Sequence, residues 1–141
     1  MKQGVIIIVE DDIEDQEIFR EAISELGVMN PLVFFHEGVS ALDYLQKTPD
    51  QPFIIFCDIN IPLMNGLQLR EHIDADERLR RKSIPFVFYT TSLNKEEINK
   101  AYELTVQGYF VKENSFAETK ESIRLILEYW DKCKHPNSIL I

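Results

Sequence analysis

The sequence predicts an α/β protein, a doubly wound parallel sheet of five strands with five helices packed against it. Short apolar runs alternate along the chain with stretches in which apolar residues recur at helical spacing. This alternation is typical of parallel strands joined by helical crossovers. Several runs are apolar at nearly every position, as expected for central strands that helices cover on both faces.

The predicted strands are short runs rich in β-branched and aromatic residues. They span residues 5–9, 32–35, 53–57, 86–89 and 108–111. The longest apolar runs are far below the roughly 20 residues that a membrane-spanning helix needs, and the first residues lack the pattern of a signal peptide. We therefore expect a cytoplasmic protein with no membrane partner.

The first two predicted helices lie before and after the second strand. Their apolar positions are Phe19, Ala22, Ile23 and Leu26 in the first, and Ala41, Leu42 and Leu45 in the second. Asp12 is predicted to cap the first helix, with Asp15 in its first turn, and Gly27 follows its last turn. The second helix is expected to stop before Pro49.

The third helix should begin near Gly66 and carry Leu69 and Ile73. The polar stretch that follows it, through the basic cluster at residues 78–82, is interpreted as a solvated connection to the fourth strand.

Capping boxes mark the last two predicted helices. Asn94 with Glu97 begins one, and Ser115 with Glu118 begins the other. Their apolar positions are Ile98, Ala101 and Tyr102 in the first, and Phe116, Thr119, Ile123, Ile126 and Trp130 in the second. The final helix is therefore expected to have the broader apolar face.

Residues 1–141 are predicted to form a single domain, with a core over residues 4–132 and a short tail over residues 133–141. No internal repeat or low-complexity linker divides the chain, and a domain of this size buries about 70% of the surface that its unfolded chain exposes. Pro136 ends helical continuation, while Ile139, Leu140 and Ile141 are able to pack on a neighbouring surface.

Composition disfavours several classes of function. The net charge of −9 argues against a nucleic-acid surface that depends on phosphate contacts. The two cysteines, Cys57 and Cys133, show no CxxC spacing, so neither a redox motif nor a zinc site is indicated. The three histidines also lack metal-ligand spacing.

Polar residues directly follow four of the five predicted strands. Glu10, Asp11 and Asp12 follow the first strand, Asp58 the third, Thr90, Thr91 and Ser92 the fourth, and Lys112 the fifth. In an open parallel sheet, ligands bind beyond the carboxyl ends of the strands. We therefore expect these groups to meet at one edge of the sheet although they lie far apart in sequence.

Carboxylates gathered at one edge repel one another. At a separation of about 4 Å, a pair of like charges costs about 1 kcal/mol in bulk water and about 4 kcal/mol at an effective dielectric of roughly 20. A divalent cation held by one or two carboxylates and water offsets this repulsion, and such a sparse oxygen site suits Mg²⁺ better than Ca²⁺. Lys112 is expected to neutralise part of the remaining charge and to hold an incoming phosphoryl oxygen.

Asp58 ends the apolar run of the segment IIFCDINIPLMNG. Packing explains a carboxylate there poorly, because a buried charge needs a partner, and its position favours a functional role. A carboxylate at this edge is able to attack phosphorus and form an aspartyl phosphate, while a metal and a lysine absorb charge on the transferring group. Pro62 and Gly66 restrict the path of the loop that follows.

Five features in order along the chain resemble the receiver domains of bacterial two-component response regulators. They are the acidic pair Glu10 and Asp11, Asp58 in DINIPLMNG, the hydroxyl of Thr90, the ring of Tyr109 and Lys112 in GYFVK. The resemblance covers residues 4–130 and implies the flavodoxin-like strand order 2-1-3-4-5. YTTS and the polar stretch before IPFVFY further resemble the stand-alone regulators associated with phytochrome-type sensor kinases.

The resemblance also implies a role for each of these residues. Asp58 would be the phosphoacceptor, Lys112 would pair with the phosphoryl group, and Thr90 would donate its hydroxyl to it. Tyr109 would change rotamer as Thr90 moves and so switch the face of the last two helices. The implied Mg²⁺ ligands are Asp11, Asp58, the backbone carbonyl of Asn60 and, through water, Glu10.

Two residues depart from the pattern of most receivers. Glu113 stands where a proline usually follows the lysine through a cis bond, and a non-proline cis bond costs about 3 kcal/mol. We therefore expect a differently shaped loop. Thr91 is larger than the residue usual after the switch threonine, and it is expected to narrow access to Asp58 and slow the entry or loss of a phosphoryl group.

The resemblance implies a signalling protein and not an enzyme, with self-phosphorylation and autodephosphorylation as its only reactions. It would accept a phosphoryl group on Asp58 from a histidine kinase or a phosphotransfer protein, then bind a downstream protein, as a monomer or homodimer. A pseudo-receiver that binds partners without phosphorylation stays open, since the Glu113 departure permits it. A phosphohydrolase with an aspartyl nucleophile fits less well, because Asn60 stands where that chemistry commonly uses a second acid.

Overall fold

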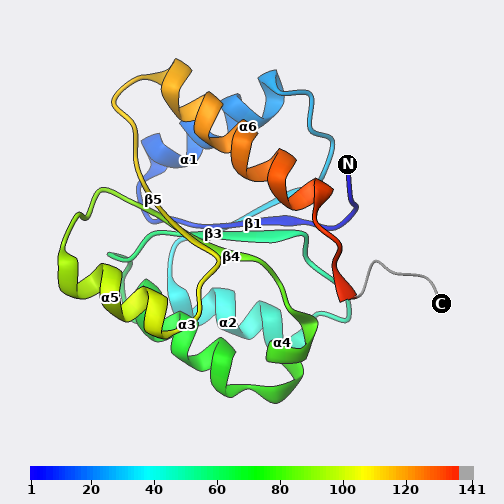
Figure 1. Cartoon of the computed structure of the whole chain (residues 1–141), viewed down its shortest axis with the longest axis vertical. Helices are drawn as coiled ribbons and strands as arrows, with labels where there is room; N and C mark the ends of the chain where they lie inside the picture. Colours follow the sequence, from blue (N-terminus) through cyan, green and yellow to red (C-terminus); the bar gives the residue numbers. More distant parts are fainter. Residues whose placement is uncertain (137–141) are drawn as a thin grey trace.

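The computed structural model describes residues 1–136, and a five-stranded sheet lies between two layers of helices (Figure 1). The strands are β1 (Ile6–Val9), β2 (Leu32–Phe35), β3 (Ile54–Cys57), β4 (Phe86–Thr90) and β5 (Gly108–Val111). Their order is β2-β1-β3-β4-β5, and every neighbouring pair is parallel. The predicted sheet and its implied strand order are both confirmed.

The described residues form six helices. On one face of the sheet lie α1 (Ile13–Glu25) and α6 (Phe116–Lys132), and on the other lie α2 (Gly38–Lys47), α3 (Gly66–Ala75), α4 (Glu77–Lys82) and α5 (Lys95–Glu103) (Figure 1). The predicted N-caps are confirmed, since the side chains of Asp12, Asn94 and Ser115 each accept a hydrogen bond from a backbone N–H three residues later. The two predicted capping boxes form only this half, because Glu97 accepts from the hydroxyl of Ser92 and Glu118 from the hydroxyl of Ser115.

Helix α4 corrects the prediction of five helices, since its residues were interpreted as a solvated connection. Asp76 caps it by accepting a hydrogen bond from the backbone N–H of Leu79 at 3.1 Å. Leu79 is only 1% exposed, and Arg78 donates hydrogen bonds to the backbone carbonyls of Leu45 and Thr48, at 3.3 and 2.8 Å. One buried leucine in a six-residue helix makes no periodic pattern, so tertiary packing stabilises a helix that the sequence pattern does not predict.

Both faces of the sheet are packed. Along β1, Ile6 and Ile8 belong to the core under α1 and α6, while Ile7 and Val9 belong to the core on the opposite face. This division follows from the period of two along a strand. It explains why the central strands are apolar throughout and why polar residues begin only where β1 and β3 end.

The predicted end of the first helix is confirmed. Gly27 follows α1 with a φ of 72°, a left-handed conformation that glycine adopts at little cost. The predicted packing of Ile139, Leu140 and Ile141 lies outside the described residues. Among the helices of residues 1–136, none combines the length and apolar character that crossing a bilayer demands.

Candidate functional site

The register of the sheet brings the polar ends of β1 and β3 together. Val9 is paired with Cys57, and the backbone N–H of Asp58 donates to the carbonyl of Val9 at 3.0 Å. The next residues, Glu10 and Asp58, therefore leave neighbouring strands at the same level. Both are buried, although each is charged in its ordinary state at neutral pH.

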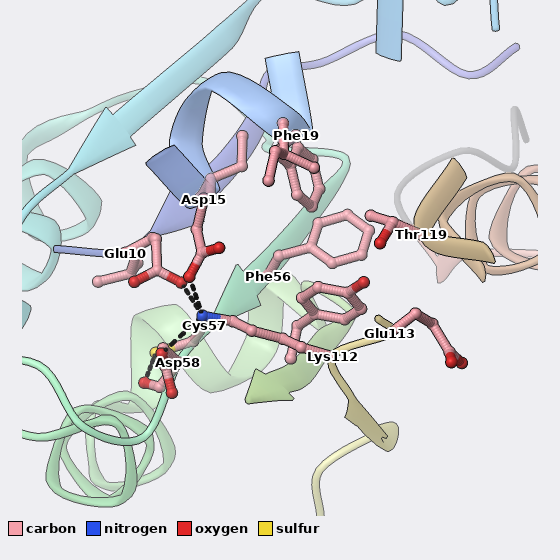
Figure 2. Close-up of a pocket in the computed structure, with 13 residues that line it drawn as sticks. Glu10, Asp15, Phe19, Phe56, Cys57, Asp58, Lys112, Glu113 and Thr119 are labelled. Atoms are coloured by element: carbon pink, nitrogen blue, oxygen red, sulfur yellow. Dashed lines mark hydrogen bonds and ion pairs between the residues drawn. The ribbon is translucent and has the colours of Figure 1, made fainter. Parts of the chain in front are cut away.

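The ammonium of Lys112 lies among three carboxylates (Figure 2). Its Nζ is 2.5 Å from Glu10 Oε1, 2.7 Å from Asp15 Oδ2 and 3.0 Å from Asp58 Oδ2. The backbone directs Lys112 there from β5, since its N–H donates to the carbonyl of Thr90 at 2.8 Å. Carboxylates from two segments that are remote in sequence thus share one cation.

The other oxygen of Asp58 is held by backbone donors. Oδ1 accepts hydrogen bonds from the N–H groups of Ile59 at 2.7 Å and Asn60 at 3.4 Å. Gly66 lies against this turn, and its N–H donates to the carbonyl of Ile59 at 2.8 Å. A Cβ at Gly66 would collide with the backbone oxygen of Asp58, so glycine is needed here for close approach. The loop therefore holds the carboxylate in one orientation at the edge of the sheet.

The site carries more negative than positive charge. Burial raises the pKa of Glu10 to about 7, against the opposing effect of its hydrogen bond and ion pair with Lys112. Burial alone would lower the pKa of Lys112, but its hydrogen bonds to Asp15 and Glu10 outweigh burial and hold that pKa above its usual value. One ammonium shared by three carboxylates leaves charge that a further cation would offset.

The acidic residues after β1 take different positions. Asp12 is the N-cap of α1 and accepts a hydrogen bond from the backbone N–H of Asp15 at 3.1 Å, as predicted. Asp11 is exposed, and the structure brings it into none of the ion pairs around Lys112. Glu10 alone of the three contacts Lys112, and its second oxygen accepts from the N–H of Asp12 at 3.1 Å.

The donors at this edge fit a small hard cation. Within residues 1–136 no three His, Cys, Asp or Glu side chains are grouped as a ready metal cage. Mg²⁺, however, takes only one or two carboxylates and completes its shell with water and substrate oxygens. Glu10 and Asp58 offer such oxygens, with Asp11 and the carbonyl of Asn60 in the adjoining loops. These four residues would hold the cation, which would supply charge stabilisation for a transferring phosphoryl group.

Thr90 and Tyr109 are linked through the loop that follows β4. The hydroxyl of Thr90, a fully buried residue, accepts a hydrogen bond from the N–H of Ser92 at 3.3 Å. Tyr109 donates its hydroxyl to the carbonyl of Ser92 at 2.8 Å. Ser92 in turn donates to Glu97 in the first turn of α5 at 2.5 Å. A displacement of the Thr90 side chain would therefore alter hydrogen bonds that reach both Tyr109 and α5.

The pocket beside the acid cluster lies between α1, the sheet and the start of α6. Figure 2 shows Phe19 and Phe56 on its apolar side and Glu10, Asp15 and Lys112 at its charged end. The hydroxyl of Tyr89, which also lines it, is the one buried side-chain polar atom in the described part of the chain without a hydrogen-bond partner. Asp58 thus adjoins a space that solvent or a small group is able to enter.

Sequence reasoning missed Asp15, which was assigned only to the first turn of α1. The helical period would place residue 15 on the same face as Phe19 and Ala22, which are both buried, and this pattern was the available signal. The bond between Lys112 and Glu113 is trans, as are all peptide bonds in the described residues. Glu113 and Thr91 are both exposed.

Comparison with known proteins identifies the family. The sequence pattern of the response regulator receiver domain matches residues 6–124. The chain is 31% identical over 130 residues to a probable methanogenesis regulatory protein, FilR2, of Methanothrix harundinacea. This match covers 89% of this chain and 83% of the FilR2 chain.

Two solved structures are also similar. The phosphorylated cyanobacterial phytochrome response regulator RcpA superposes with a TM-score of 0.87 and 28% identity, over 96% of this chain and 99% of that one. The Mn²⁺-bound form of response regulator Rcp1, a protein of Synechocystis sp., superposes with a TM-score of 0.83 and 27% identity, over 94% of this chain and 99% of that one. The chain therefore belongs to the response regulator receiver domain family and resembles the phytochrome-associated regulators within it.

Proposed function

We propose that this chain accepts a phosphoryl group on Asp58 from a histidine kinase or a phosphotransfer protein, and then signals by binding a downstream protein. The observation that carries the proposal is the ammonium of Lys112, 3.0 Å from the Asp58 carboxylate and 2.5 Å from Glu10. This arrangement supplies a nucleophile, a cation for the phosphoryl oxygens and further carboxylates for a metal. RcpA, a similar protein, has been solved in a phosphorylated form, and Rcp1 in a Mn²⁺-bound form.

The reaction at Asp58 is a transfer to oxygen. A carboxylate oxygen attacks the phosphorus of the donor's phosphohistidine, the new O–P bond forms as the P–N bond breaks, and the imidazole nitrogen leaves with its electron pair. Lys112 donates to an oxygen of the transferred group, and backbone N–H groups keep Asp58 oriented. Bound Mg²⁺ would neutralise charge on the same oxygens.

The signal would travel from Thr90 to α5. A phosphoryl oxygen on Asp58 offers the Thr90 hydroxyl a charged acceptor, which is stronger than a neutral one. Moving that hydroxyl would disturb the hydrogen bond that it accepts from the backbone N–H of Ser92. Ser92 is also hydrogen-bonded to Tyr109 and to Glu97. Two arrangements of this network would present two surfaces to a partner.

Intact-mass spectrometry tests the proposal directly. Incubation with Mg²⁺ and acetyl phosphate should add one phosphoryl group to the wild-type chain and none to Asp58→Asn. The absence of any added group, with partner binding retained, would instead support a pseudo-receiver. Sustained hydrolysis of general phosphate esters would support a phosphohydrolase.

A further inference from the structure

Asp15 contacts the lysine that the proposed phosphoryl chemistry needs. Its Oδ2 is 2.7 Å from Lys112 Nζ, closer than the 3.0 Å that separates Nζ from Asp58. Asp15 reaches the site from the first turn of α1, whereas Lys112 follows β5. Figure 2 shows Glu10 and Asp15 on one side of the ammonium and Asp58 on the other.

The contacts of Lys112 use its whole donor capacity. An ammonium has three N–H donors, and the carboxylates of Glu10, Asp15 and Asp58 accept from it. A phosphoryl oxygen on Asp58 would therefore compete with a carboxylate that is already bound. Lys112 must release one of these partners before it engages the new group.

Phosphorylation turns Asp58 itself into the acyl phosphate, so Glu10 and Asp15 are the two partners of Lys112 that remain carboxylates, and Asp15 is released at the lower cost. Its side chain is 36% exposed, against 7% for Glu10 and 11% for Asp58. Water is able to replace Lys112 around an exposed carboxylate, whereas a buried carboxylate that loses its partner stays without one. The difference in exposure thus indicates that Asp15 loses its contact with Lys112 more easily than Glu10 does.

We propose that Asp15 is a positioning residue that holds Lys112 in the unphosphorylated protein and is exchanged for a phosphoryl oxygen on phosphorylation. This inference rests on the proposed function of Asp58. Because Asp15 competes for the ammonium of Lys112, it weakens the interaction between Lys112 and the phosphoryl group. Asp15 therefore lowers the affinity of the site for phosphoryl-like anions and shortens the lifetime of the aspartyl phosphate.

The chain contains a matched control for Asp15. Glu14 is the neighbouring acidic residue in the first turn of α1, it is exposed, and none of the ion pairs of Lys112 involves it. Glu14→Gln removes the same charge from the same helix end as Asp15→Asn. A difference between the two variants therefore reports the position of Asp15 beside Lys112 and not the charge at the helix end, which both variants lose.

Beryllofluoride, a stable mimic of the phosphoryl group, provides the main measurement in the presence of Mg²⁺. We expect Asp15→Asn to bind it roughly tenfold more tightly than the wild type, the scale of one charge-assisted hydrogen bond. The affinity of Glu14→Gln for beryllofluoride should stay within about twofold of the wild-type affinity. Asp15→Glu keeps a carboxylate at this position, so its affinity should be close to that of the wild type and below that of Asp15→Asn. Equal affinities for Asp15→Asn and Glu14→Gln would overturn the inference.

The ammonium resonance of Lys112 gives a second readout without metal or anion. In ¹H–¹⁵N spectra, assigned by its loss in Lys112→Met, the signal should shift and exchange faster with water in Asp15→Asn but not in Glu14→Gln. An unchanged signal in Asp15→Asn would show that Asp15 does not hold the lysine. A wild-type chain that neither binds beryllofluoride nor takes a phosphoryl group would refute the proposed function, and this spectrum would still test the contact itself.

Discussion

The Lys112 ammonium lies 3.0 Å from the carboxylate of Asp58, although the two residues are 54 positions apart in sequence. The contact crosses the end of β4, which lies between β3 and β5 in the sheet. It joins the side chain of the residue that follows the last strand to the carboxylate that follows the central strand. The predictions below start from this contact and from the carboxylates that share it.

Replacing Lys112 with methionine should destabilise the metal-free protein. Glu10 and Asp58 would lose their cation while they remain buried, and breaking such a buried pair costs about 3 kcal/mol. Urea unfolding measures the decrease in the free energy of unfolding. Lys120→Met is the control, because Lys120 pairs with Glu25 on the surface at 3.1 Å and an exposed pair contributes less than about 1 kcal/mol. Equal losses in the two variants would contradict the buried role of Lys112.

The contribution of Glu10 to the stability of the metal-free protein should fall as the pH rises from about 4.5 to about 7. Glu10 has its ordinary pKa of 4.5 in the unfolded chain and a pKa of about 7 in the folded one. Between these values the folded state binds the proton more strongly, so deprotonation favours unfolding. To separate the effect of Glu10 from the rest of the protein, the quantity to measure is the difference in unfolding free energy between the wild type and Glu10→Gln. A difference that does not change across this pH range would refute the assignment.

Magnesium should raise the melting temperature of the protein. A ligand that binds only the folded state stabilises it by about 2.7 kcal/mol when its concentration is 100 times Kd. Asp11→Asn should weaken this response, whereas Asn60→Ala should keep it, since the backbone carbonyl is the implied ligand at position 60. Differential scanning fluorimetry with and without EDTA makes the comparison. A full response in Asp11→Asn would remove Asp11 from the ligand set.

Thr91→Ala should accelerate autodephosphorylation. Thr91 is exposed beside Thr90, and its side chain is expected to narrow the approach of water to the phosphorylated Asp58. The decay of the phosphorylated species, followed by intact mass after removal of acetyl phosphate, measures the rate. Decay at the wild-type rate would show that Thr91 does not control access.

Much of the fold and site follows from local sequence patterns. Apolar runs and helical periods predict the alternation of strands and helices, and parallel strands end at one edge, so the residues after them, Glu10, Asp58 and Lys112, were expected to meet there. The N-caps at Asp12, Asn94 and Ser115 were also predictable from the sequence, because an N-cap is a contact between residues three positions apart.

Only the tertiary structure decided the features that depend on packing between distant elements. Helix α4 exists because Leu79 is buried and Arg78 bonds to the end of α2, and no short-range pattern encodes either contact. Asp15 meets Lys112 because the packing of α1 against the sheet and α6 fixes which way the first turn of α1 faces. Asp11 precedes the N-cap of that helix and takes no part in the ion pairs of Lys112. The sequence by itself determined which charged residues arrive at the edge of the sheet. The packing of the helices determined which of those charges share the lysine, since an ion pair depends on side-chain geometry that spacing along the chain does not specify.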